Sequence, residues 1–140
     1  MSPEVFDHFY STTLPQLKKL YGFTDYRVDF FGGEPLMNFD LIKYVTPILK
    51  KDRNMTRLGV VTNGLLMDEE KKNYILSNNI NYSISFDGLG NKNNRIDVNG
   101  NSTYEQYQNH PVLKDMMNFC KVMVSPDTSD IMEDTLIDFV

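Results

Sequence analysis

The sequence predicts an α/β fold in which helices pack against a parallel β-sheet. Short apolar runs typical of strands alternate with longer segments of helical periodicity, which is the pattern of right-handed β–α–β crossovers. Polar loops follow the successive apolar runs, and parallel sheets bind ligands where their strands end. The 140 residues, 41% of them hydrophobic, suffice for one domain with its own core.

The first half of the chain predicts two helices and two strands. The first helix is expected over residues 2–22, because Ser2 suits the N-cap, Pro3 the first turn and Gly22 the end. Pro15 is expected to kink or divide it. The next expected elements are a strand near 26–31, a helix at 39–51 and a strand near 57–62.

The second half continues the alternation. Asp68 suits the N-cap of a helix whose first turn carries Glu69 and Glu70, which complement the helix dipole. The long polar loop 88–102 is either a functional lid or partly disordered. The remaining expected elements are a strand near 80–86, helical segments at 103–108 and 112–119, a strand near 120–125 and a helix at 129–140.

Apolar and polar side chains alternate along residues 82–87, which read YSISFD. Successive side chains of a strand point to opposite faces, so one face of this strand is polar. A parallel strand buried on both faces would be apolar throughout. The pattern favours a barrel or half-barrel with a wet, ligand-holding lumen; the alternative is an edge strand with one solvated face.

Composition excludes several classes of protein. The net charge of −5 argues against a general nucleic-acid or anionic-membrane binder. No apolar run approaches the ~18 residues of a membrane span, and the first residues lack the pattern of a signal peptide, so a cytoplasmic location is expected. The single cysteine, Cys120, excludes an internal disulfide, and neither His8 nor His110 has a partner at ligand spacing, so no metal site is predicted.

The loop after the first strand reads Gly-Gly-Glu-Pro, residues 32–35. Pro35 disfavours helical backbone at Glu34, and the two glycines allow a ligand to approach the main chain. An extended tip exposes carbonyl oxygens and Glu34 adds a carboxylate, which suits an ammonium group rather than a phosphate. The simplest alternative is a turn without a ligand.

Four motifs in order carry a family resemblance: FFGGEPLMNFDLI, VVTNGLLMDEE, YSISFDGLGNKNNR and KVMVSPDT. In their order and spacing they closely resemble the radical S-adenosylmethionine (SAM) enzymes. The nearest branch resembles the anaerobic sulfatase-maturating enzymes and their peptide-modifying relatives. The resemblance implies a partial (β/α) barrel of the radical SAM type, with about four parallel strands in sequential order and helices outside.

The resemblance also implies a cofactor-binding site for SAM. The family motif that holds the methionyl amino group matches Gly32, Gly33 and Glu34, and Asn63 matches a position lining the same cavity. It implies no catalytic residue in this chain.

The strand that begins near residue 80 supplies the rest of this implied site. Ser85 best matches the family residue that contacts the ribose or the carboxylate, and Asp87 comes next. Arg95 matches an arginine that pairs with a carboxylate, although the His-Asp pair that typically precedes it is absent.

Radical chemistry in this family needs a four-iron–four-sulfur (4Fe–4S) cluster on three cysteines of a CxxxCxxC loop, and this chain has one cysteine. Residues 1–140 are therefore expected to form a partial core domain that lacks the first strand with its cluster loop and the last strand. A cluster is expected only if a longer chain or a partner supplies that loop. The strand near 26–31 should then be an exposed edge.

Three functions remain open at this point. The first is the SAM-binding portion of a radical enzyme acting on a peptide or protein, inactive in radical chemistry as this chain alone. The second is a cluster-less binding or scaffold module of the same fold, for instance beside a chain that supplies the missing strand. The third is a plain doubly wound α/β domain such as a nucleotide binder, which the missing phosphate-binding fingerprint disfavours.

Overall fold

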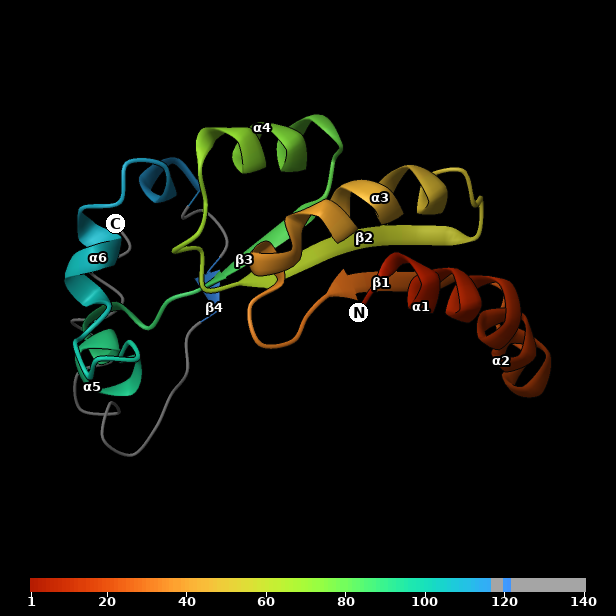
Figure 1. The fold of residues 1–140 in the computed structure, drawn as a ribbon, viewed down its shortest axis with the longest axis horizontal. Helices are drawn as coiled ribbons and strands as arrows, with labels where there is room; N and C mark the ends of the chain where they lie inside the picture. The colour runs from red at the N-terminus through yellow and green to blue at the C-terminus, as the bar shows by residue number, and fades with distance from the viewer. Residues whose placement is uncertain (117–119, 122–140) are drawn as a thin grey trace.

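The computed structural model describes residues 1–116 and 120–121. One parallel sheet runs through these residues with its strands in chain order (Figure 1). Its strands are β1 (Tyr26–Phe30), β2 (Met55–Thr62), β3 (Asn81–Ser85) and the two-residue β4 (Cys120–Lys121). The α/β class is confirmed, and β1, β2 and β3 form a parallel sheet with its strands in sequential order, as predicted. The fourth strand was expected near 120–125, and most of that range lies outside the described residues, as do residues 117–119 and the expected last helix.

The expected first helix is present but is divided into three parts. They are α1 (Pro3–His8), the π-helical turn η1 (Phe9–Thr13) and α2 (Leu14–Tyr21). Pro15 lies in the first turn of α2 and has no N–H to donate to a carbonyl one turn earlier, which agrees with the expected division of the helix near this residue. Gly22 then ends α2 in the left-handed region at φ 70°, with its N–H donating to the Lys18 carbonyl at 2.9 Å.

Two longer helices connect the three strands, α3 (Phe39–Leu49) after the 3₁₀ turn η2 (Pro35–Asn38), and α4 (Glu69–Ser77). Asp68 caps α4 as predicted, because its Oδ1 accepts from the Lys71 N–H at 2.8 Å. Pro47 lies inside α3 and cannot donate to the Lys43 carbonyl. The Tyr74 hydroxyl of α4 donates to that carbonyl instead, at 3.3 Å, so the proline is tolerated through a contact between helices.

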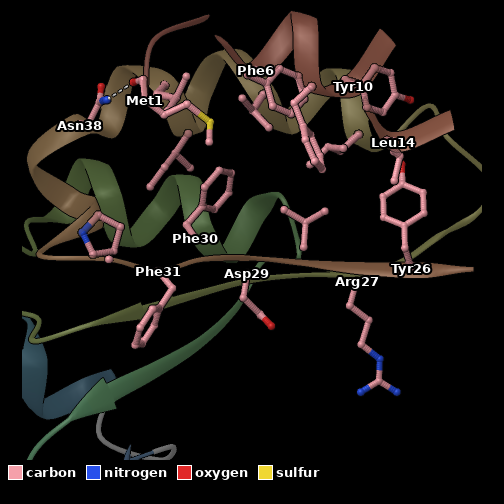
Figure 2. A pocket seen from close by; sticks show the side chains of 18 of the residues that line it. Met1, Phe6, Tyr10, Leu14, Tyr26, Arg27, Asp29, Phe30, Phe31 and Asn38 are labelled. Atoms are coloured by element: carbon pink, nitrogen blue, oxygen red, sulfur yellow. Dashed lines mark hydrogen bonds between the residues drawn. The ribbon is translucent and has the colours of Figure 1, made fainter. Parts of the chain in front are cut away.

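The two faces of the sheet differ in chemistry. Buried apolar side chains of the strands pack with α1, α3 and α4 on one side, where Ile42, Val45, Ile75 and Ile84 are almost fully enclosed. Figure 2 shows Phe30 and Tyr26 on that side of β1, and Arg27, Asp29 and Phe31 on the other. The alternation therefore separates a helix-covered face from a polar face, as expected for part of a barrel with helices outside.

The strand β1 lies at an edge of the described sheet. The Tyr26 N–H donates to the Asn54 carbonyl at 3.0 Å, so the main chain of Tyr26 points toward β2. By alternation, the main-chain groups of Arg27 and Asp29 point to the open edge. The described residues thus bear out the prediction of an exposed edge here.

The segment after β3 is ordered rather than an open loop. It contains η3 (Gly88–Gly90), α5 (Asn91–Asn94) and a bridge between Ile96 and Ser102, and it leads into α6 (Tyr104–Gln108) and η4 (Leu113–Met116). The Asn91 side chain is fully buried within this segment. Its Oδ1 accepts from the Asp87 N–H at 2.6 Å and its Nδ2 donates to Thr103 Oγ1 at 3.2 Å. This regular structure disfavours disorder of residues 88–102, and their role as a lid stays a prediction.

Candidate functional site

The Gly-Gly-Glu-Pro loop leaves the carboxyl end of β1 in an extended conformation. Glu34 adopts φ −139° and ψ 108°, which is the extended backbone that Pro35 imposes on the preceding residue. Gly32 has φ 136°, a value that side-chain-bearing residues rarely adopt, and a Cβ built on Gly33 would meet no atom within 4 Å. The main chain at the two glycines is therefore open to a ligand.

The Glu34 carboxylate ties this loop to the end of β2. Its Oε1 accepts from the Leu36 N–H at 3.0 Å and from Thr62 Oγ1 at 2.5 Å, while Oε2 accepts from the Asn63 N–H at 2.8 Å. The sequence predicted Glu34 as a ligand for an ammonium group. Three protein donors already orient this carboxylate, so such a contact would use its remaining lone pairs, beside carbonyl oxygens of the loop.

Asn63 and Ser85 lie side by side on the polar face. The register pairs Thr62 with Ile84, so the next residues, Asn63 and Ser85, are neighbours one position further along. Thr62 and Ile84 are buried on the helix side, which puts the following residue of each strand on the opposite face. Asn63 Oδ1 accepts from the Leu65 N–H at 2.9 Å, whereas Asn63 Nδ2 and Ser85 Oγ have no hydrogen-bond partner among the described residues.

Asp87 and Arg95 form an ion pair beside these strand ends. Arg95 Nε donates to Asp87 Oδ2 at 2.8 Å and Nη2 donates to Oδ1 at 3.0 Å, a two-point contact that suits the planar guanidinium. Asp87 is 1% exposed and the Arg95 side chain 24%. Both residues were predicted to bind the cofactor. Here they bind each other, so a ligand carboxylate would have to use Arg95 Nη1 or displace Asp87.

The structure adds two residues that the sequence analysis did not single out. Thr62 bonds Glu34, and the buried Tyr107 of α6 donates its hydroxyl toward the carbonyls of Asn63 and Ser85. Thr62 directly precedes a predicted site residue, but strand alternation puts its side chain on the opposite face from that of Asn63, so alternation gave no indication of this contact. Tyr107 lies 44 residues from Asn63 along the chain, and no local pattern indicates that contact.

These contacts divide the seven predicted residues into connected groups. Glu34 and Asn63 bond directly, Asn63 and Ser85 share Tyr107, and Asp87 bonds Arg95. Gly32 and Gly33 directly precede Glu34 in the sequence, so they adjoin the group that contains Glu34 and Asn63. The arrangement offers an amide N–H₂, a hydroxyl and open main chain on one edge of the sheet, which suits a small polar ligand such as an amino acid moiety.

A cavity of about 590 Å³ lies between the first helices and β1. Its walls are largely apolar, with Phe6, Tyr10 and Leu14 on the helices facing Tyr26 and Phe30 across it (Figure 2). Its lining includes residues of the Gly-Gly-Glu loop and of β1. Its chemistry suits apolar side chains of a protein segment rather than a charged amino acid.

A carboxylate with a lowered pKa, that of Asp52, lies at the other end of the sheet. The Tyr26 hydroxyl donates to Asp52 Oδ2 at 2.6 Å, and this bond, with the Asn54 N–H, lowers the pKa of Asp52 below its usual value. Burial and the neighbouring Asp52 raise the pKa of Tyr26 far above that of an ordinary tyrosine. This cluster joins the first helices to the loop before β2, so it serves the fold rather than the strand-end site.

Metal-binding and membrane-spanning features were also sought in the described residues. Residues 1–116 and 120–121 contain no group of three or more His, Cys, Asp or Glu side chains that could hold a metal ion. None of their helices is both long and apolar enough to cross a membrane.

Comparison with known proteins gives one informative similarity. The radical SAM cyclopropyl synthase TigE of Paramaledivibacter caminithermalis is 29% identical over 115 residues, which cover 80% of this chain. The same alignment covers 24% of the relative, so the chain matches about a quarter of that protein's length. No protein-family model matches the chain. The similarity supports the radical SAM family, and the α/β structure with its parallel sheet is consistent with part of a radical SAM barrel; the sulfatase-maturating branch is not confirmed.

Proposed function

We propose that this chain is the SAM-binding portion of a radical SAM-type enzyme that modifies a peptide or protein. The observation that supports it most is a pair of polar groups, Asn63 Nδ2 and Ser85 Oγ, that have no hydrogen-bond partner within residues 1–116 and 120–121 and that lie beside an open Gly-Gly main chain at the strand ends. The similarity to a radical SAM enzyme supports the choice of SAM over other amino acids. A cytoplasmic location and peptide modification are parts of this proposal.

The hydrogen-bond donors and acceptors of the site fit the methionyl end of SAM. The main-chain carbonyls near Gly32 and Gly33, together with Glu34, would accept from the ammonium group. The Asn63 amide and the Ser85 hydroxyl would donate to the carboxylate or to a ribose hydroxyl. Arg95 would add a cation beside the carboxylate, but its fork already binds Asp87, so we assign it a weaker contact than the sequence suggested.

The residues present do not fit a 4Fe–4S cluster. Three thiolates are required, and the sequence contains one cysteine. We therefore derive no radical step from this chain and propose that it does not cleave SAM by itself. A longer polypeptide or a second chain would have to supply the cluster loop.

The second candidate is a cluster-less binding or scaffold module, and the open edge of β1 favours it. Within the part of the chain that the structure describes, no strand pairs with the main chain of Arg27 and Asp29 on the outer side of β1, and both residues border the apolar cavity between β1 and the first helices. A strand added there would complete main-chain hydrogen bonds and place alternate side chains in the cavity. A partner strand is compatible with SAM binding, so the two candidates are distinguished by whether the strand ends bind SAM.

The test is a calorimetric titration of SAM into the wild-type chain and the Glu34→Gln variant, with Glu70→Gln as a control on the exposed start of α4. Weak binding is expected for the wild type. Glu34→Gln should weaken it about 10-fold or more, because the variant removes the charge beside the ammonium group. Glu70→Gln should bind like the wild type. Equal affinities of Glu34→Gln and wild type, or no binding by the wild type, would contradict the SAM site and leave the scaffold module.

A further inference from the structure

Tyr107 occupies a particular place between two strand ends. Its hydroxyl donates toward the Asn63 carbonyl and lies 3.1 Å from the Ser85 carbonyl, so one donor serves the ends of both β2 and β3. The side chain is 4% exposed, and its ring packs on Phe86 with the ring centroids 4.8 Å apart. The ring cannot move far from this position without disturbing the core.

The two carbonyls belong to Asn63 and Ser85, whose side-chain polar groups Nδ2 and Oγ are assigned above to ligand binding. A hydrogen bond that holds a carbonyl restrains the main chain of that residue and so the position of the Cβ atom from which its side chain starts. Tyr107 therefore limits where Asn63 Nδ2 and Ser85 Oγ can lie, while the rotamer of each side chain sets their final direction. The Asn63 N–H is held by Glu34 from the other side. Asn63 is therefore fixed on both flanks, by Glu34 toward β1 and by Tyr107 from α6.

The helix that carries Tyr107 is itself attached to the segment after β3. Thr103 Oγ1 donates to the Arg95 carbonyl at 2.9 Å, the Thr103 N–H donates to the same carbonyl at 3.0 Å, and the Tyr107 N–H donates to the Thr103 carbonyl at 3.1 Å. Arg95 in turn binds Asp87, the second residue after β3. A continuous series of bonds thus links the segment after β3 to the strand ends through Tyr107.

We propose that Tyr107 is a positioning residue that sets the spacing and direction of Asn63 and Ser85 for a ligand at the strand ends. This inference rests on the proposed SAM site and adds a residue to it that lies beneath the ligand and does not touch it. A residue of this kind changes affinity only through the groups that it positions. Its effect should therefore disappear when those groups are removed.

The experiment is a double-mutant cycle with SAM as the ligand, using the whole chain. Tyr107→Phe keeps the ring and removes the hydroxyl, and it should weaken SAM binding roughly fivefold, the factor for one lost neutral hydrogen bond. In the Ser85→Ala background the same change should have a clearly smaller effect. Tyr104→Phe is the matched control, because this buried tyrosine of α6 also packs on Phe86 but its hydroxyl accepts from Gln108 of its own helix. It should leave SAM affinity unchanged.

Additive effects of Tyr107→Phe and Ser85→Ala would overturn the proposal, since a merely structural tyrosine would act equally in both backgrounds. So would an equal loss in Tyr104→Phe. A second measurement does not depend on SAM: the carbonyl ¹³C shifts of Asn63 and Ser85 should both move in Tyr107→Phe, and the wild type should show a slowly exchanging Tyr107 hydroxyl proton. If the wild type binds no SAM while these signals behave as expected, the proposed function fails and the contact stands. If the hydroxyl proton exchanges freely and the shifts do not move, the contact itself is refuted.

Discussion

Replacing Arg95 by methionine tests whether this arginine stabilises the fold or serves only to bind a ligand. Methionine keeps much of the length and the apolar contact of the side chain but removes the guanidinium. The structure pairs that group with Asp87 through two hydrogen bonds of 2.8 and 3.0 Å. We expect Arg95→Met to destabilise the chain in the complete absence of ligand.

The magnitude follows from burial. Asp87 is 1% exposed, and removing one partner of a buried pair costs about 3–5 kcal/mol because the remaining buried charge loses its ion-pair partner. The Arg95 side chain is 24% exposed, which places the expected loss near the lower end, about 3 kcal/mol. For a domain of this size that corresponds to a fall in Tm of roughly 10 °C or more.

Arg57→Met is the matched control. Arg57 Nε lies 4.0 Å from Asp29 Oδ1, and these side chains are 48% and 44% exposed, so the pair should contribute less than about 1 kcal/mol. The assay is urea unfolding of both variants and the wild type without SAM. Asp87→Asn combined with Arg95→Met should recover part of the loss, because the buried charge is then removed. Equal and small losses in Arg95→Met and Arg57→Met would refute the structural role of the Asp87–Arg95 pair.

Two further predictions concern the fold around the site. The pKa of Asp52 is lowered mainly by the Tyr26 hydroxyl, so the contribution of Asp52 to stability is present above about pH 4 and is lost as the pH falls below it. The urea midpoint should therefore decline less between pH 5 and 2.5 in Asp52→Asn than in the wild type. Parallel declines would contradict this. Gly64→Ala should cost at least about 1–2 kcal/mol by urea unfolding, because Gly64 has φ +78° and a Cβ there would lie 2.8 Å from Leu113 Cδ2. Gly59→Ala should cost less, since its Cβ would meet the end of the exposed Asp29 side chain, which can move away, and the Asn81 carbonyl at an ordinary 3.5 Å. The reverse order would refute the reasoning.

Local signals in the sequence were sufficient for most of the secondary structure. Asp68 and Gly22 mark helix ends that the structure reproduces, and the alternation in residues 82–87 identified a polar face of the sheet correctly. These features depend on residues close together in the chain, where capping and side-chain alternation act directly. Pro15 indicated a division of the first helix, but it did not indicate that the dividing segment would be a π-helical turn.

The contacts that define the site were less accessible to sequence reasoning. The resemblance named Glu34 and Arg95 as ligand-binding residues, but it could not indicate that Thr62 and the Asn63 main chain satisfy Glu34, or that Asp87 satisfies Arg95. Such pairs depend on how the strand ends meet in space. A motif records which residues are present, whereas hydrogen-bond partners depend on the packing of the whole sheet.

The most direct test of the central claim is an NMR titration of the ¹⁵N-labelled chain with SAM. The account predicts that amide shifts change at the carboxyl ends of the strands, at Gly33, Glu34, Asn63 and Ser85, while Asn54 and Tyr26 at the opposite end stay unchanged. It also predicts that the Asn63 side-chain amide moves with them, since its Nδ2 has no partner among the described residues. Shifts confined to the opposite end of the sheet, or no shifts at saturating SAM, would contradict the assignment of this edge as the SAM site.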